Sequence, residues 1–124
     1  MNLVVFLGNR CQEMDASETK NTIVLPVLSS LGWDFSKTDQ VYEQKRLENS
    51  IVDLILSSKD SNKKVLIEVR RIGEKLTNYH ERQLFHYIAQ KTFYMAVLTN
   101  GMEWWFYFPT QKGRWERSAR QQFK

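Results

Sequence analysis

The amino-acid sequence predicts an α/β domain in which a mixed β-sheet is flanked by helices. The chain has 124 residues, of which 42% are hydrophobic and 13% aromatic, and this is enough for one core without disulfide bonds or metal. The hydrophobic spacing alternates between helical and strand periods in the order α-α-β-β-β-α-β-β. Because no linker or repeat interrupts this order, we expect residues 1–124 to form a single domain with its core over residues 15–108.

The N-terminal part of the chain is predicted to be helical. Residues 2–13 favour a first helix, although their Val and Phe residues leave a strand open. A second helix is expected to begin after Asp15, a residue type that caps helix N-termini, and to end at Gly32. Pro26 is expected to kink this helix or to shorten its regular part.

Strand patterns and one further helix follow. We expect strands at residues 40–46, 50–58, 63–71, 94–99 and 102–108. A capping box at Asn78 opens a helix that runs to about Lys91. Asn100-Gly101 is typical of a tight turn between the last two strands. The tail from Gly113 is compatible with either a helix or a short edge strand.

The positive charge lies at the C terminus. The whole formal net charge of +4 falls in the basic tail, residues 112–124, because the rest of the chain is balanced. Arg114 and Arg117 could contact phosphates there, although such a tail is more simply a solvated terminus. No apolar run approaches the length of a membrane span, and no signal peptide is visible. With Cys11 as the single cysteine, these features favour a cytoplasmic protein.

The hairpin expected over residues 50–71 carries the side chains most relevant to chemistry. If a four-residue polar loop joins its strands, Asp53 lies opposite Glu68 with Arg70 on the same face, and Val52 belongs to the other face. Two facing carboxylates repel, so that a cation must offset them. Either Arg70 or a divalent metal fills this role, and oxygen-only ligation favours Mg²⁺ or Mn²⁺. A purely structural Asp–Arg–Glu network is the alternative.

Five stretches of the chain occur in an order that is known from a nuclease superfamily. They are SETKNTIVLPVLSSLGW (17–33), IVDLIL (51–56), LIEVRR (66–71), QLFHY (83–87) and VLTNGMEWWFYF (97–108). In this series the chain resembles the PD-(D/E)xK nucleases, and most closely the N-terminal endonuclease domain of type I restriction enzyme R subunits. The resemblance implies a restriction-endonuclease-like core and Mg²⁺-dependent hydrolysis of DNA phosphodiester bonds in a restriction or other anti-phage system.

The resemblance also implies roles for individual residues. Asp53 and Glu68 match the metal-binding carboxylates, and the Val69 carbonyl would add a ligand. Glu18 matches a helix glutamate that can extend the shell of the metal or of the attacking water.

Further along the chain, Gln83 and Tyr87 match a pair that helps to engage nucleic acid, and one turn of helix separates them. DNA would be the substrate. The partners would be other restriction-system subunits or a motor domain, because this chain has no glycine-rich phosphate loop. Self-association into an oligomer is a further open alternative.

The sequence departs from the family pattern at Arg70, where the family has lysine. Arginine stays charged and cannot act as a base, although it can hold a phosphate or balance carboxylates. It could equally lock Asp53 and Glu68 into a salt bridge that excludes metal. Two functions therefore remain open, a metal-dependent endodeoxyribonuclease and a catalytically impaired nuclease fold that serves as a nucleic-acid-binding or scaffold module.

Overall fold

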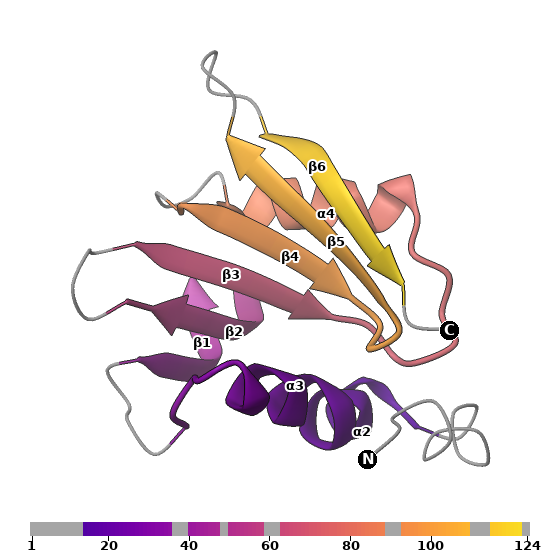
Figure 1. Cartoon of the computed structure of the whole chain (residues 1–124). Coiled ribbons are helices and arrows are strands. Elements are labelled where there is room, and N and C mark those ends of the chain that lie inside the picture. Colours follow the sequence, from indigo (N-terminus) through magenta and orange to yellow (C-terminus); the bar gives the residue numbers. More distant parts are fainter. Residues whose placement is uncertain are drawn as a thin grey trace.

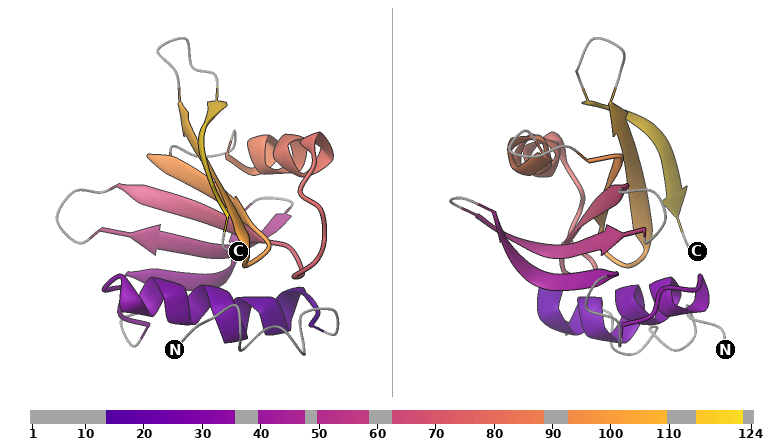
Figure 2. Two further views of the ribbon diagram at one scale, coloured as in Figure 1. Left: turned by 45° about the vertical axis from the view of Figure 1, so that its right-hand side comes forward. Right: turned by 90° about the vertical axis from the view of Figure 1, so that its left-hand side faces the viewer.

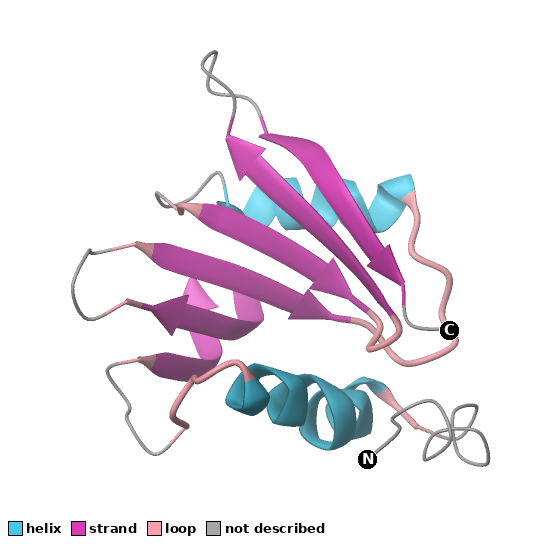
Figure 3. Ribbon diagram, in the orientation of Figure 1, coloured by secondary structure: helices cyan, strands magenta, loops and turns pink. Residues whose placement is uncertain are grey.

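A six-stranded sheet with helices on both faces forms the molecule (Figures 1 and 3). The computed structural model describes residues 14–35, 40–47, 50–58, 63–88, 93–109 and 115–122. The helical segments are α2 (Ala16–Thr19), the π-helical turn η1 (Lys20–Val24), α3 (Leu25–Ser30) and α4 (Asn78–Ile88). The strands are β1 (Val41–Leu47), β2 (Ser50–Ser57), β3 (Lys64–Val69), β4 (Met95–Thr99), β5 (Glu103–Pro109) and β6 (Trp115–Gln122).

The strands lie in the sheet in their chain order, from β1 to β6. Only β3 and β4 are parallel, and α4 makes the crossover between them, whereas the other neighbouring strands are antiparallel. This is the predicted mixed sheet. The tail forms an edge strand on β5, so that the strand alternative holds for residues 115–122. The predicted helix over residues 2–13 lies outside the described part of the chain.

The N-terminal helix of the described chain passes through Pro26 without ending there. Asp15 caps it, because its side chain accepts a hydrogen bond from the Glu18 N–H at 2.8 Å. Proline has no N–H and its ring crowds the preceding turn. The wider π-turn η1 directly before α3 accommodates this, so that the helix continues past Pro26 while its regular α-helical part is shortened, which is the second of the two expected outcomes. Gly32, with φ of 104°, follows the helix as expected.

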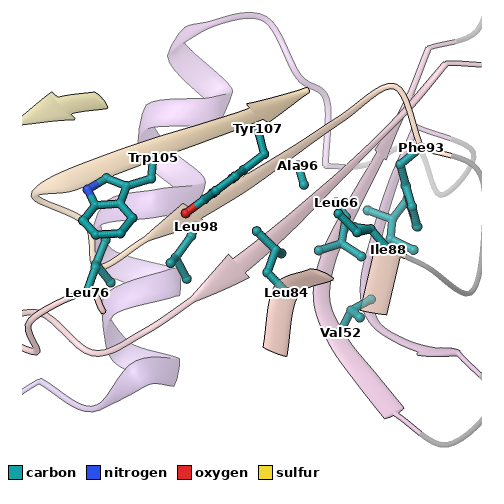
Figure 4. Packing of buried hydrophobic residues seen from close by; sticks show 11 residues of the cluster. Val52, Leu66, Leu76, Leu84, Ile88, Phe93, Ala96, Leu98, Trp105 and Tyr107 are labelled. Carbon is teal, nitrogen blue, oxygen red and sulfur yellow. The ribbon is translucent and has the colours of Figure 1, made fainter. Parts of the chain in front are cut away.

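Two hydrophobic layers fix the helices to the sheet. Figure 2 shows α4 on one side of the sheet and the α2–η1–α3 helix on the other. In the α4 layer, Leu84 and Ile88 pack on strand residues such as Leu66 (Figure 4). Val52 also belongs to this layer, which corrects its expected position on the opposite face. β2 pairs with β3 from Leu54 onward, whereas Val52 is paired with Lys45 of β1 on its other side.

The hairpin between β4 and β5 forms one residue later than predicted. Asn100 closes it through its N–H to the Glu103 carbonyl at 3.3 Å, and its side-chain oxygen accepts the N–H groups of Met102 and Glu103. The central residues are therefore Gly101 and Met102, with φ of 90° at the glycine. A Cβ atom on Gly101 would lie 3.1 Å from side-chain atoms of both Thr19 and Ile23. The turn thus packs directly against the N-terminal helix.

Gly101 and Gly32 both have positive φ, so alanine substitutions at the two positions distinguish the cost of backbone strain from the cost of steric contact. We expect Gly101→Ala to lower the free energy of unfolding by about 1–3 kcal/mol, because alanine adds both strain and crowding against Ile23. Gly32→Ala is the matched control, since nothing lies within 4 Å of its Cβ position. Urea denaturation of the two variants measures the difference, and a loss at Gly32 as large as that at Gly101 would contradict the packing argument.

Candidate metal and phosphate site

Asp53 and Glu68 meet where the β2–β3 pairing ends. The register Leu54↔Ile67 and Ile55↔Leu66 is the predicted one, and the next position on each strand is Asp53 and Glu68. Asp53 Oδ2 accepts a hydrogen bond from the Val69 N–H at 2.8 Å. The carboxyl groups of Asp53 and Glu68 are themselves hydrogen-bonded to each other. The hairpin therefore brings the two acids into contact, as the sequence predicted.

The contact between the two acids changes the ionisation of Glu68. Burial raises the pKa of Glu68 from 4.5 to about 10, and the hydrogen bond to Asp53 and the charge of Asp53 add to this effect. The charge of Arg70 and the Val69 N–H act in the opposite direction but do not prevail. At neutral pH the Glu68 carboxyl group consequently keeps its proton and is uncharged.

Arg70 does not form a salt bridge with this pair. Its Nε and Nη2 donate side-on to Glu74, at 2.6 Å to Oε2 and 3.3 Å to Oε1. The Glu74 carboxylate raises the pKa of Arg70, and the pKa of Glu74 is lowered by the same hydrogen bond. Arg70 is still near enough for its charge to lower the pKa of Glu68. The guanidinium thus lies beside the acid pair without occupying it.

Glu74 and His80 are parts of this arrangement that the sequence did not reveal. His80 Nε2 lies 3.3 Å from Glu74 Oε2, while its Nδ1 accepts the Thr77 N–H at 3.0 Å. Burial lowers the pKa of His80, so the ring is neutral, and because Nδ1 accepts, its proton lies on Nε2, beside Glu74. The segment from Arg70 to Thr77 has no regular period. Its one sequence signal is Gly73, whose φ of 86° turns the chain back.

Helix α4 places Tyr87 close to the carboxyl groups. Burial raises the pKa of Tyr87, and the charges of Glu68 and Asp53 raise it further. Gln83, one turn earlier, donates through Nε2 to the hydroxyl of Tyr79 at 2.9 Å. Because residues four apart share a helix face, Tyr79, Gln83 and Tyr87 form a polar stripe along α4 whose Tyr87 end lies near the acid pair.

The other residues singled out from the sequence are less closely connected. Glu18 is exposed on α2, and within the described ranges its side chain has no hydrogen bond to either acid. The first turn of α2 is nevertheless tied to the chain after β3, since Thr19 Oγ1 accepts the Ile72 N–H at 2.9 Å. Arg114 lies outside the described residues. Arg117 pairs with Tyr107 along the β5–β6 ladder, and its side chain is not described.

The donor set at the acid pair suits a hard divalent cation. The two carboxyl groups are in contact and Glu68 keeps its proton at neutral pH, so a cation could take the place of that proton. The donors are oxygen atoms alone, which fits Mg²⁺ or Mn²⁺. In the described part of the chain no cluster of three or more His, Cys, Asp or Glu residues could hold a metal. The protein would therefore supply two carboxylates and a main-chain carbonyl, leaving the other positions to water and substrate, as Mg²⁺ prefers.

A solved structure shares this fold. No family model and no curated protein matches the sequence. The chain is similar to a structure described as a fragment of a type I restriction enzyme HsdR subunit from Vibrio vulnificus YJ016, with a TM-score of 0.61 and 18% identity over 89% of this chain. The present chain spans 24% of that structure's length. The predicted α/β fold, a mixed sheet flanked by helices, is thereby confirmed as one that the chain shares with part of this HsdR fragment. None of the described helices is long and apolar enough to cross a membrane.

The raised pKa of Glu68 predicts how stability depends on pH. Between pH 4.5 and about 10 the folded protein holds a proton that the unfolded chain releases. This contribution to stability is complete below the unfolded pKa and is lost as the pH rises toward the folded pKa. We expect the free energy of unfolding to fall over this range, and Glu68→Gln to flatten the fall. Urea titrations at several pH values measure it. Glu43→Gln, which removes a carboxylate paired with Lys20 instead, should keep the slope.

Proposed function

We propose that the chain is a Mg²⁺-dependent endonuclease domain that hydrolyses DNA phosphodiester bonds in a restriction or other anti-phage system. The observation that carries this proposal is the contact between the Asp53 and Glu68 carboxyl groups where the β2–β3 pairing ends, with Asp53 Oδ2 also accepting the Val69 N–H at 2.8 Å. A buried acid pair of this kind is costly unless a cation or a proton offsets it. Its position at the end of a hairpin, in a fold like that of a restriction enzyme HsdR fragment, supports the same conclusion.

The acid pair would hold the metal. Asp53, Glu68 and the Val69 carbonyl are the proposed ligands, with Mn²⁺ as an alternative to Mg²⁺. When bound, the ion would lower the pKa of a water and stabilise charge on the scissile phosphate. Glu18 would help to orient that water from the first turn of α2, which Thr19 ties to the segment after β3.

The positive charge beside the pair would bind the phosphate. Arg70 keeps its charge at all relevant pH values and so contributes N–H donors instead of accepting a proton. Gln83 and Tyr87 on α4 would contact the nucleic acid next to the site, and Arg114 and Arg117 would contact its backbone from the tail. These contacts carry no sequence information by themselves.

Sequence specificity would come from partners. The similar HsdR structure is much longer than this chain, and other restriction-system subunits or a motor domain would supply DNA recognition and translocation. A cytoplasmic location follows from this assignment.

A second function also has an observation in its favour. Arg70 stands where the family that this sequence resembles has lysine. Its Nε donates a hydrogen bond to Glu74 Oε2 at 2.6 Å. A nuclease fold with this change could bind nucleic acid or act as a scaffold without turnover. The two functions differ in whether the acid pair is needed for an observable reaction.

Plasmid nicking tests the role of the acid pair. We expect cleavage of supercoiled DNA with Mg²⁺ or Mn²⁺, and we expect Asp53→Ala to lower the rate at least about 1,000-fold, because the charge stabilisation supplied by the metal would be lost. Glu43→Gln is the matched control. DNA retention without any cleavage, unchanged by Asp53→Ala, would support the scaffold function instead.

DNA binding tests the α4 stripe separately from cleavage. We expect Tyr87→Phe to weaken DNA binding about 3- to 10-fold in Ca²⁺, through loss of one hydrogen bond near the phosphate. Fluorescence anisotropy with a labelled duplex measures the Kd. Tyr94→Phe is the control, because Tyr94 lies at the other end of β3, where its N–H donates to the Lys64 carbonyl. Equal affinities for the two variants would remove Tyr87 from the interface.

A further inference from the structure

We propose that Glu74 is a positioning residue that holds the Arg70 guanidinium for the substrate phosphate, with His80 and Asn100 in turn holding Glu74. This inference rests on the proposed function, since it concerns the phosphate at the same site. Neither the sequence patterns nor the resemblance assigns a role to Glu74. Its contacts to Arg70 and His80 and the tie of its carbonyl to Asn100 are all on the described part of the chain.

The Arg70–Glu74 pair has the geometry of a fixed support. Glu74 binds the side of the guanidinium that carries Nε and one N–H of Nη2. A side-on pair of this kind fixes the plane of the guanidinium as well as its distance. The remaining N–H donors of the fork, including both on Nη1, are not used by this pair, and among the described residues Nη1 has no acceptor. They are the donors that suit the two oxygens of a phosphate.

Glu74 is itself held from two further directions. His80 Nε2 lies 3.3 Å from the Oε2 atom that accepts from Arg70. At the main chain, Asn100 Nδ2 donates to the Glu74 carbonyl at 2.8 Å. Arg70 is anchored in the same way, because its N–H donates to the Thr99 carbonyl at 2.8 Å. Arg70 and Glu74 are thus both tied to the end of β4, so that little conformational freedom remains to be lost when a phosphate binds.

This support explains how arginine can serve where the family has lysine. A lysine ammonium is a point charge on a flexible chain and needs no fixed plane. Arginine has a longer, planar head whose value depends on its orientation. When a carboxylate of the protein fixes one edge of the guanidinium, the direction of the opposite edge is fixed as well. Glu74 would therefore accompany Arg70 as a functional unit.

Glu74 could instead sequester Arg70, and removal of Glu74 would then change the cleavage rate in the opposite direction. If Glu74 instead sequesters Arg70, its removal frees the guanidinium and raises the cleavage rate. If Glu74 positions Arg70, its removal lowers the rate, because a misplacement of about 1 Å near reacting groups costs on the order of 100-fold. The two outcomes can be separated by one substitution.

A double-mutant cycle with Arg70→Gln and Glu74→Gln tests the unit. We expect kcat for plasmid nicking to fall about 10- to 100-fold in Glu74→Gln, with a smaller change in KM. Arg70→Gln should fall at least as far, and the double variant should match Arg70→Gln alone, because Glu74 acts through Arg70. Additive losses, or a gain of activity in Glu74→Gln, would overturn the proposal. Glu43→Gln removes a carboxylate from another ion pair and is the control.

A second readout does not depend on cleavage. In the NMR spectrum of the whole chain, the Arg70 Nε–H should exchange slowly with solvent and should lose this protection in Glu74→Gln. Inorganic phosphate should shift the Arg70 signals, and with lower affinity in that variant. If Asp53→Ala leaves cleavage unchanged while these signals behave as expected, the proposed function fails but the support remains. An Arg70 signal that is unaffected by Glu74→Gln would exclude the support itself. Glu74→Asp, which keeps the charge but shortens the reach, serves if Glu74→Gln unfolds.

Discussion

The contact between the Asp53 and Glu68 carboxyl groups is the constraint on which the site depends. The hairpin register places both acids at the same end of β2 and β3, and the Val69 N–H fixes one of them. Two such groups cannot both be charged at this distance without a compensating cation. In the folded chain the Glu68 carboxyl group keeps its proton at neutral pH, and in the proposed function a metal ion would take the place of that proton.

Arg70 is a cation near the acid pair that does not neutralise the pair. Its charge lowers the pKa of Glu68, yet burial and the Asp53 contact still dominate. The reason is geometric, since Glu74 takes the guanidinium side-on at the end of β3. The arginine is therefore turned to a different acid and stays separate from the acid pair. A structural Asp–Arg–Glu network would have joined them.

Sequence patterns predicted the strongly periodic parts of the molecule. The 50–71 hairpin appears with the expected register because polar turn residues separate two apolar strands. The position of the β4–β5 turn differed by one residue, because the Asn100 side chain satisfies the N–H groups that follow it. Val52 was assigned to the wrong face: it packs in the α4 layer, at a point where β2 is paired with β1 and the pairing with β3 has not yet begun.

The acid pair itself was predictable, but the groups around Arg70 were not. Strand period alone brings Asp53 opposite Glu68. The Glu74 contact instead depends on the turn at Gly73 and on the orientation of the His80 ring, which is set by a main-chain N–H. Neither feature has a periodic signature, and a loop carboxylate four residues from an arginine is common in any sequence.

Calorimetric titration of the chain with Mg²⁺ at pH 7, in buffers of different ionisation enthalpy, tests the central claim most directly. If the metal replaces the proton of Glu68, binding should release about one proton per ion, and Glu68→Gln should abolish that release. Binding without proton release in the native chain, or no binding at millimolar Mg²⁺, would contradict the account.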